Sequence, residues 1–211
     1  MLVITCHGNS NTKQSFNYIK LCLPRYTYID LSFDSRLGFW NNLEVMEDLL
    51  SYYPDEQFIF LTHSLGSVYA AYLASFYRKR TLALITLSAP WGGSEAATLL
   101  NVIAPTQLFR DIKPSSDVIK GVQQLSLYCP ITSIVTTSGQ SSLWVKINDG
   151  VLSRESMMAL KGDVEYYDVH ATHNEILLHE ATVEIVEEAI EQAFQKSKEN
   201  ALINEMEECD E

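Results

Sequence analysis

Ser64 lies in the pattern Thr62-His63-Ser64-Leu65-Gly66, where a serine hydroxyl could serve as a nucleophile. A short apolar run at residues 58–61 comes before it, and apolar side chains recur at helical spacing from Leu65 onward. A serine on a sharp turn between a buried strand and a helix is the arrangement of a nucleophile elbow. The alternative is a serine that only caps the helix. The strand before it and the helix after it favour the nucleophile.

A nucleophilic serine needs a base within hydrogen-bonding distance, because its hydroxyl is too weak an acid to attack an acyl group unaided. The chain has five histidines. His7 and His63 lie beside tight turns and are expected to hold those loops, while His179 is expected inside the last helix. His170 and His173 follow the last expected strand, and we prefer His173 because it has the freedom of a loop. An ordinary structural histidine is the alternative for either.

The elements that must position these side chains alternate along the chain. Strands are expected at residues 2–6, 26–31, 58–61, 81–87, 130–137 and 164–169, and helices at 15–22, 40–53, from 65 onward, and after 174. This order predicts right-handed crossovers and a mostly parallel sheet with helices on both faces. Ligands bind at the carboxyl ends of the strands in such sheets.

A polar loop, His7-Gly8-Asn9-Ser10, follows the first expected strand. A glycine in that position lets the backbone turn sharply and leaves the next amides free to face a ligand. Asn9 or Ser10 is therefore a candidate to donate one N–H of an oxyanion hole, with the amide of Leu65 as the other donor. A plain strand-to-helix loop is the alternative.

An excursion over residues 92–128 separates two expected strands, with weak helical patterns around 96–103 and 118–125. We expect it to form a small helical cap or lid over the site. Trp91, Leu108 and Phe109 are candidates to line an apolar substrate pocket there, and Ser10 is a further candidate. Ordinary core packing is the alternative for each apolar residue.

Composition and charge exclude several classes of function. The 211 residues are 46% hydrophobic and 20% charged, with a net charge of −12, so nucleic acid is not an expected partner. No stretch approaches the roughly 20 apolar residues of a membrane span, and no signal peptide is expected. Four cysteines without paired spacing indicate reduced thiols in the cytoplasm, and no motif suggests a metal or cofactor. We expect one domain over residues 1–198 and an acidic, disordered tail over 199–211.

Together these motifs resemble the α/β-hydrolase superfamily, and within it the small lipases and lipid-acyl hydrolases. The matching pieces span nearly the whole chain: His7-Gly8-Asn9, residues 62–66, Asn148-Asp149-Gly150-Val151 and His173. Residues 88–94, Ser-Ala-Pro-Trp-Gly-Gly-Ser, look like a loop of lecithin:cholesterol acyltransferase-like and lysosomal phospholipase-like enzymes. His-Gly-Asn in the first loop is similar to the inositol-deacylase group. The resemblance implies an α/β-hydrolase fold.

The chain order of that superfamily is serine, acid, histidine, and Asp149 lies between the other two. Other nearby aspartates belong to the last strand or to the excursion, although an Asp-Gly pair is also a common turn. The resemblance implies Ser64 as nucleophile, His173 as base and Asp149 as the acid that orients the base. It also implies an oxyanion hole made by the amides of Asn9 and Leu65.

Three features depart from the superfamily pattern. Thr62 stands where a glycine is usual, Ser67 stands where a second glycine is frequent, and eleven residues separate Thr137 from Asp149. The expected function is hydrolysis of a small-molecule or lipid ester through an acyl-enzyme, with peripheral contact to lipid and no membrane span. A thioesterase, an amidase or an acyltransferase would use the same residues, and a non-catalytic binding protein on a decayed scaffold is the alternative from another class.

Overall fold

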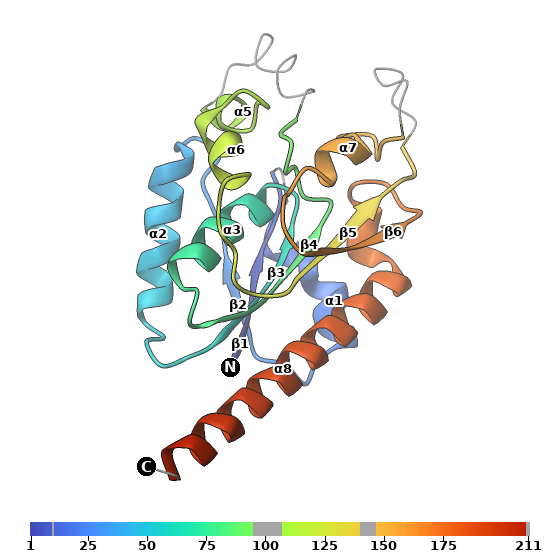
Figure 1. Cartoon of the computed structure of the whole chain (residues 1–211). Coiled ribbons are helices and arrows are strands. Elements are labelled where there is room, and N and C mark those ends of the chain that lie inside the picture. The colour runs from blue at the N-terminus through green and yellow to red at the C-terminus, as the bar shows by residue number, and fades with distance from the viewer. Residues whose placement is uncertain (10, 95–106, 140–146, 210–211) are drawn as a thin grey trace.

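The computed structural model describes residues 1–9, 11–94, 107–139 and 147–209, with the backbone alone for residues 201 and 203–209. Its strands form a six-stranded sheet in the order β2-β1-β3-β4-β5-β6, and every neighbouring pair is parallel (Figure 1). The strands are β1 (Leu2–Cys6), β2 (Tyr28–Leu31), β3 (Phe58–His63), β4 (Thr81–Leu87), β5 (Ile131–Thr136) and β6 (Val164–Val169).

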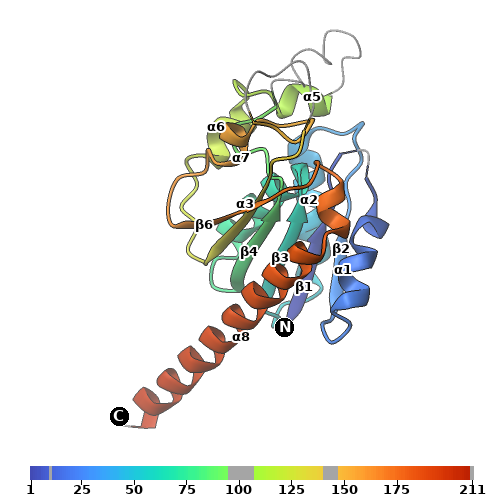
Figure 2. The same cartoon turned by 90° about the vertical axis from the view of Figure 1, so that its right-hand side faces the viewer.

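Helices cover both faces of this sheet (Figures 1 and 2). One face carries α2 (Phe39–Ser51), α3 (Leu65–Phe76) and α6 (Asp117–Val122). The other face carries the 3-10 helix η1 (Lys13–Phe16), α1 (Asn17–Cys22) and α8 (Glu180–Cys209). Further short helices are α5 (Gln107–Asp111), α7 (Arg154–Met157) and the 3-10 helix η2 (Glu175–Leu178). This arrangement is the parallel sheet between two helical layers that the sequence predicts.

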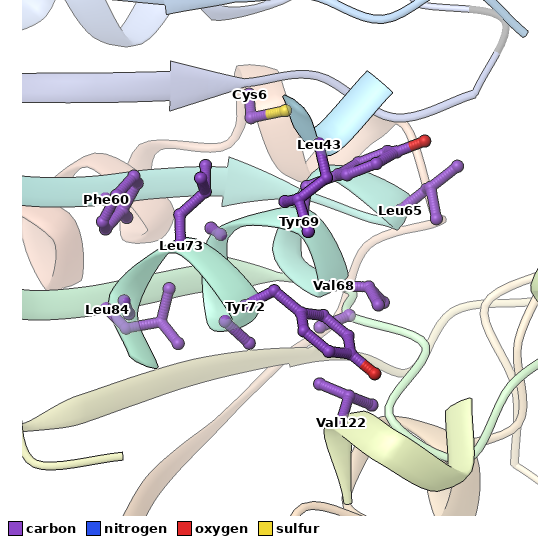
Figure 3. Close-up of a cluster of buried hydrophobic side chains, with 14 of the residues drawn as sticks. Cys6, Leu43, Phe60, Leu65, Val68, Tyr69, Tyr72, Leu73, Leu84 and Val122 are labelled. Carbon is purple, nitrogen blue, oxygen red and sulfur yellow. The ribbon is translucent and has the colours of Figure 1, made fainter. Parts of the chain in front are cut away.

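The central strand β3 shows how the two layers are held. Successive side chains of a strand point to opposite faces. Phe58 and Phe60 therefore join the cluster under α3, whereas Ile59 and Leu61 join the cluster under α8. Figure 3 shows the first cluster, with Phe60 of the sheet beside the side chains of α3. Burial on both faces explains why residues 58–61 are wholly apolar and do not alternate with polar residues.

All six expected strands are present, and most differences are at their ends. β2 begins at residue 28, and the helix expected over 15–22 is split into η1 and α1. His179 lies just before α8 and not inside it, which corrects the prediction from sequence. Its backbone is extended, and its Nδ1 accepts a hydrogen bond from the N–H of Ala181 at 3.2 Å. His179 therefore ends η2 and helps to begin the next helix.

The end of the chain also differs from expectation, because α8 continues to Cys209 where the sequence predicts a disordered tail after residue 198. In both views the last turns of α8 extend beyond the sheet (Figures 1 and 2). Residues 199–209 contain Ala, Leu, Met and several Glu, all good helix formers. Extending a helix that already exists requires no new nucleus, so high propensity is enough to continue it. Within the described residues, every helix is too short or too polar to cross a bilayer.

The helical excursion between β4 and β5 rests on the α2 and α3 side of the molecule. α6 contacts α3, where the hydroxyl of Tyr72 donates to the carbonyl of Val118 at 3.0 Å. Just after α5, Ile112 joins the same core, while the carboxylate of Asp111 accepts from the N–H of Phe39 at 2.9 Å, at the start of α2. The weak helical pattern around 96–103 lies outside the described residues. The described part of the expected cap is thus fixed to two helices of the main body.

One close approach fixes the end of β1 against the start of α3. A Cβ atom added at Gly66 would collide with the carbonyl oxygen of Cys6 and lie 2.7 Å from that of His7. Both neighbours are backbone atoms, so they cannot move aside as a side chain could. Gly66 therefore lets the loop after β1 pass directly over the first turn of the helix.

Replacing Gly66 with alanine should destabilise the protein by about 3 kcal/mol or more, because the new methyl group overpacks a backbone contact. Urea denaturation would measure the loss. Gly38→Ala is the matched control, since a Cβ there would meet only the Gln107 side chain at an ordinary 3.4 Å. A Gly66→Ala protein as stable as the Gly38→Ala protein would contradict this account of the crossing.

Candidate active site

Ser64 stands on the turn between β3 and α3, at the carboxyl edge of the sheet. Its backbone has φ 51° and ψ −127°, a conformation that side-chain-bearing residues rarely adopt. The N–H of Ser64 donates to the carbonyl of Leu87 on the neighbouring strand at 2.8 Å, which anchors the turn. Such strained conformations persist only where the surroundings enforce them, and they are common at functional sites. The turn therefore has the geometry of a nucleophile elbow, with a partly exposed serine.

The three side chains expected to form a triad lie in one hydrogen-bonded line. Nε2 of His173 is 2.9 Å from Oγ of Ser64, and Nδ1 of the same ring is 2.7 Å from Oδ2 of Asp149. A carboxylate can only accept, so Nδ1 carries the proton and Nε2 accepts from the serine hydroxyl. His170, the alternative base, is exposed and makes no such contact among the described residues. This tautomer of His173 is the one that can remove a proton from Ser64.

Asp149 is held by four hydrogen bonds in a nearly closed environment, with 1% of its surface exposed. Oδ1 accepts from the N–H groups of Val151 and Leu152, at 2.9 and 2.7 Å. Oδ2 accepts from His173 and from the hydroxyl of Thr136, the latter at 2.6 Å. Burial alone would raise the pKa of Asp149, but the bonds to its charged form outweigh burial and lower that pKa. Asp149 therefore stays ionised and cannot rotate away from the imidazole.

His63 is fully buried and contacts the backbone of His173. Its Nδ1 faces the side-chain amide of Asn11 at 3.3 Å, and its Nε2 lies 2.7 Å from the carbonyl oxygen of His173. The amide can only donate and the carbonyl can only accept, so the proton is on Nε2. Asn11 also donates to Oδ1 of Asn174 at 3.2 Å. His63 thus ties the first loop to the loop that carries His173.

The two residues that replace glycines in the motif contact each other. The hydroxyl of Thr62 lies 3.0 Å from that of Ser67, and both side chains are fully buried. Thr62 also lies within 3.3 Å of the carbonyl oxygen of Ile85 on β4. The space that two glycines would leave is therefore filled by a hydrogen-bonded pair, and the turn keeps its shape.

The amides predicted to form the oxyanion hole belong to the loop after β1 and to the start of α3. Leu65 is the first residue of α3, where backbone N–H groups have no partner within the helix. A Cβ at Gly8 would lie 2.8 Å from Cβ of Ser64, so the loop that carries Asn9 passes directly over Ser64. No described residue accepts a hydrogen bond from the N–H of Asn9 or Leu65. Within the described part of the chain neither N–H is thus occupied, as an oxyanion hole would require.

The predicted pocket residues are placed differently from expectation. Trp91 and Leu108 are 0% and 2% exposed and belong to the core cluster beside α3, so neither presents a free surface to a substrate. Nε1 of Trp91 points to the Ser133 hydroxyl at 3.5 Å, which is a core contact. Phe109 is only partly buried, and Ser10 lies outside the described residues. For Trp91 and Leu108 the burial favours the alternative, ordinary core packing.

Two hydroxyl residues that the sequence analysis does not single out adjoin the site. Thr136, the last residue of β5, donates to Asp149, and the hydroxyl of Ser88, just after β4, lies 2.8 Å from that of Thr136. Neither residue belongs to a recognisable motif, because threonine and serine are common in and after strands. Within the described ranges, no three His, Cys, Asp or Glu side chains gather closely enough to bind a metal ion.

Replacing His63 with glutamine should reduce the acid sensitivity of the fold. Burial, with help from the nearby His173, lowers the pKa of His63 to about 3, against about 6.5 in an unfolded chain. Between these values the unfolded chain binds a proton that the folded protein does not, so stability falls as the pH falls. The loss is up to about 1.4 kcal/mol per pH unit.

Urea titrations between about pH 6.5 and 4.5 would measure this dependence. The His63→Gln variant should lose less stability over that range than the wild type, although it starts from a lower value. His170→Gln, which changes an exposed histidine, should keep the wild-type slope. An unchanged slope in His63→Gln would show that His63 is not held neutral by the fold.

Solved structures share this architecture, although a scan against family models and a search of the curated proteins find no match. Phospholipase PlaB from Legionella pneumophila matches 88% of this chain with a TM-score of 0.67 and 13% identity, and the match spans 58% of that protein. Monoacylglycerol lipase from Paleococcus ferrophilus has a TM-score of 0.64 and 13% identity, covering 91% of this chain and 93% of the lipase.

A third match is MGS-MChE2, an α/β hydrolase from the metagenome of sediments of the Mar Chica lagoon in Morocco. Its TM-score is 0.61 at 14% identity, over 94% of this chain and 92% of that enzyme. Likeness at such low identity concerns the fold. With its parallel sheet, its helices on both faces and its strained turn after β3, this chain has the α/β-hydrolase fold.

Proposed function

We propose that this protein is a serine hydrolase that cleaves carboxylic esters through an acyl-enzyme on Ser64. The observation that carries the proposal is the line from Asp149 through His173 to Ser64, with hydrogen bonds of 2.7 and 2.9 Å. A serine, a histidine and an acid in such a line can activate the hydroxyl. The strained backbone of Ser64 displays that hydroxyl at the carboxyl edge of the sheet.

In the first half-reaction, Oγ of Ser64 attacks the acyl carbon while its proton passes to Nε2 of His173. The carbonyl double bond opens to an oxyanion, which accepts hydrogen bonds from the amides of Asn9 and Leu65. When the oxyanion collapses, the ester C–O bond breaks and the leaving alkoxide takes the proton from His173. Asp149 stabilises the imidazolium throughout and remains ionised.

In the second half-reaction, a water molecule replaces the alcohol. His173 removes one proton from the water, whose oxygen attacks the acyl carbon and forms a second oxyanion at the same two amides. Collapse breaks the bond to Oγ, and Ser64 recovers its proton from His173. The products are one carboxylic acid and one alcohol, and the three residues return to their initial states.

We further propose a lipid or another hydrophobic acyl group as the substrate. Exposed apolar side chains follow several carboxyl ends of the sheet: Leu37 and Trp40 after β2, Ile147 and Val151 after β5, and Leu178 after β6. Apolar side chains near a ligand-binding edge favour an apolar ligand or contact with a lipid surface. The names of two structural neighbours, a phospholipase and a monoacylglycerol lipase, support the same substrate class.

The same machinery would serve a thioesterase, an amidase or an acyltransferase, since the fold does not determine the leaving group. A decayed, non-catalytic scaffold is disfavoured by the side chains around the imidazole. A binding protein would gain nothing from an ionised, buried carboxylate that is aimed at His173.

The unpaired cysteines Cys6, Cys22 and Cys129 accord with a cytoplasmic setting.

Ser64→Ala should abolish hydrolysis of p-nitrophenyl esters, with a loss of about 10⁴-fold or more in kcat, because no other group can form the acyl-enzyme. A fluorophosphonate should label the wild type at Ser64 and leave the variant unlabelled, as measured by mass spectrometry of the intact protein. The control is Ser51→Ala, which changes an exposed serine of α2. A wild-type protein that neither hydrolyses esters of any tested chain length nor reacts with the probe would refute the proposed function.

A further inference from the structure

The acid of the triad is held by more than its own loop. Oδ2 of Asp149, the oxygen that faces His173, also accepts from the hydroxyl of Thr136 at 2.6 Å. Thr136 belongs to β5, a strand of the main sheet, whereas Asp149 lies in the connection that follows it. The threonine hydroxyl therefore links the position of the acid to the rigid sheet.

The direction of the hydrogen bonds extends this link to a second hydroxyl. Thr136 has one proton, and it goes to the carboxylate, which cannot donate. The oxygen of Thr136 lies 2.8 Å from that of Ser88, so Ser88 must be the donor in that contact. Both side chains are fully buried, and water does not compete for either group. A one-way chain thus runs from Ser88 through Thr136 to Asp149.

The backbone of Ser88 shows that its position is enforced. Among the described residues, only Ser64 and Ser88 combine a side chain with positive φ, 51° and 50° respectively. The two are also equivalent in the sheet, because the N–H of Ser88 donates to Ile134 of β5 at 2.9 Å as that of Ser64 donates to Leu87 of β4. A glycine would adopt this backbone without strain. A serine there suggests that its hydroxyl is needed.

We propose that Ser88 and Thr136 are positioning residues of the active site, which fix the carboxylate of Asp149 so that one oxygen always faces Nδ1 of His173. The inference rests on the proposed triad. Among the described residues, neither hydroxyl forms a hydrogen bond with Ser64 or His173. The two hydroxyls act by holding the acid in the orientation that keeps His173 in the correct tautomer and by spreading the negative charge of Asp149 over an additional donor.

The first test removes the Thr136 hydroxyl with Thr136→Val, which keeps the shape of the side chain. We expect kcat for a p-nitrophenyl ester to fall about tenfold with little change in KM, because a hydrogen bond to a charged group is lost near the reacting atoms. Thr136→Ser keeps the hydroxyl and should recover most of the activity. Thr86→Val is the matched control, since Thr86 is buried and its hydroxyl bonds Ser133 at 3.1 Å and not a residue of the triad.

Two further measurements distinguish a role of Thr136 in positioning Asp149 from a role in core packing. Without Thr136 the carboxylate loses a donor to its charged form, so the pKa of Asp149 should rise and the acid limb of kcat/KM should shift to higher pH. Among the described residues, the titratable groups that face His173 are Asp149 and His63, and neither is changed in this variant. The downfield NMR resonance of the Nδ1 proton of His173 should also move in Thr136→Val and stay in place in Thr86→Val.

The second test separates the backbone of Ser88 from its hydroxyl. Ser88→Gly relieves the positive φ and removes the donor, so it should fold well and still lose activity, as Ser88→Ala should. The inference is overturned if Thr136→Val keeps the wild-type kcat, acid limb and Nδ1 resonance, or if Thr86→Val lowers activity equally. The NMR readout needs no turnover, so it can succeed or fail independently of the proposed esterase activity, which the fluorophosphonate tests.

Discussion

The structure depends on one tight crossing, where the chain leaves β1 and passes over the first turn of α3. Gly66 admits the carbonyl groups of Cys6 and His7 because it has no side chain. On the other side of the same turn, Ser64 is forced to a positive φ. A residue in that conformation projects its side chain away from the sheet, so the hydroxyl is displayed and not buried. The position of the loop that carries Asn9 follows from the same contact.

The imidazole of His173 is restrained from two directions. Asp149 binds Nδ1, while His63 binds the backbone carbonyl of His173. Each partner is buried and each has its own further partners, so neither can turn without breaking other hydrogen bonds. Nε2 is left as the ring atom that can exchange a proton. The low pKa of His63 matters here, because a second cation beside His173 would oppose the imidazolium that the proposed proton transfer requires.

Local pattern is sufficient to predict the strands and the tight turn at Ser64, because each depends on residues that are close in sequence. It also distinguishes His173, which lies 2.9 Å from Ser64, from the exposed His170. Predicting Asp149 also required the chain order of serine, acid and histidine, because Asp149 is far in sequence from both Ser64 and His173. Thr136 was not predictable, since Thr132 and Thr137 look equivalent in the sequence. Which hydroxyl reaches the acid depends on the packing of the loop after β5 against that strand. The burial of Trp91 was not predictable for a related reason, because an apolar side chain in a loop fits core packing and pocket lining equally well.

The departures from the motif at Thr62 and Ser67 are explained by the contact between the two side chains in the folded protein. Taken singly, each replaces a small residue with a larger polar one at a crowded turn, and each suggests a weakened site. In the structure the hydroxyl oxygens of Thr62 and Ser67 lie 3.0 Å apart and form a hydrogen bond. Burying either hydroxyl without a partner would cost free energy. Loss of the Thr62 hydroxyl would remove the partner of the buried Ser67 hydroxyl, whereas Thr62 also lies within reach of the carbonyl of Ile85. The two residues that stand in place of glycines therefore preserve the turn that displays Ser64.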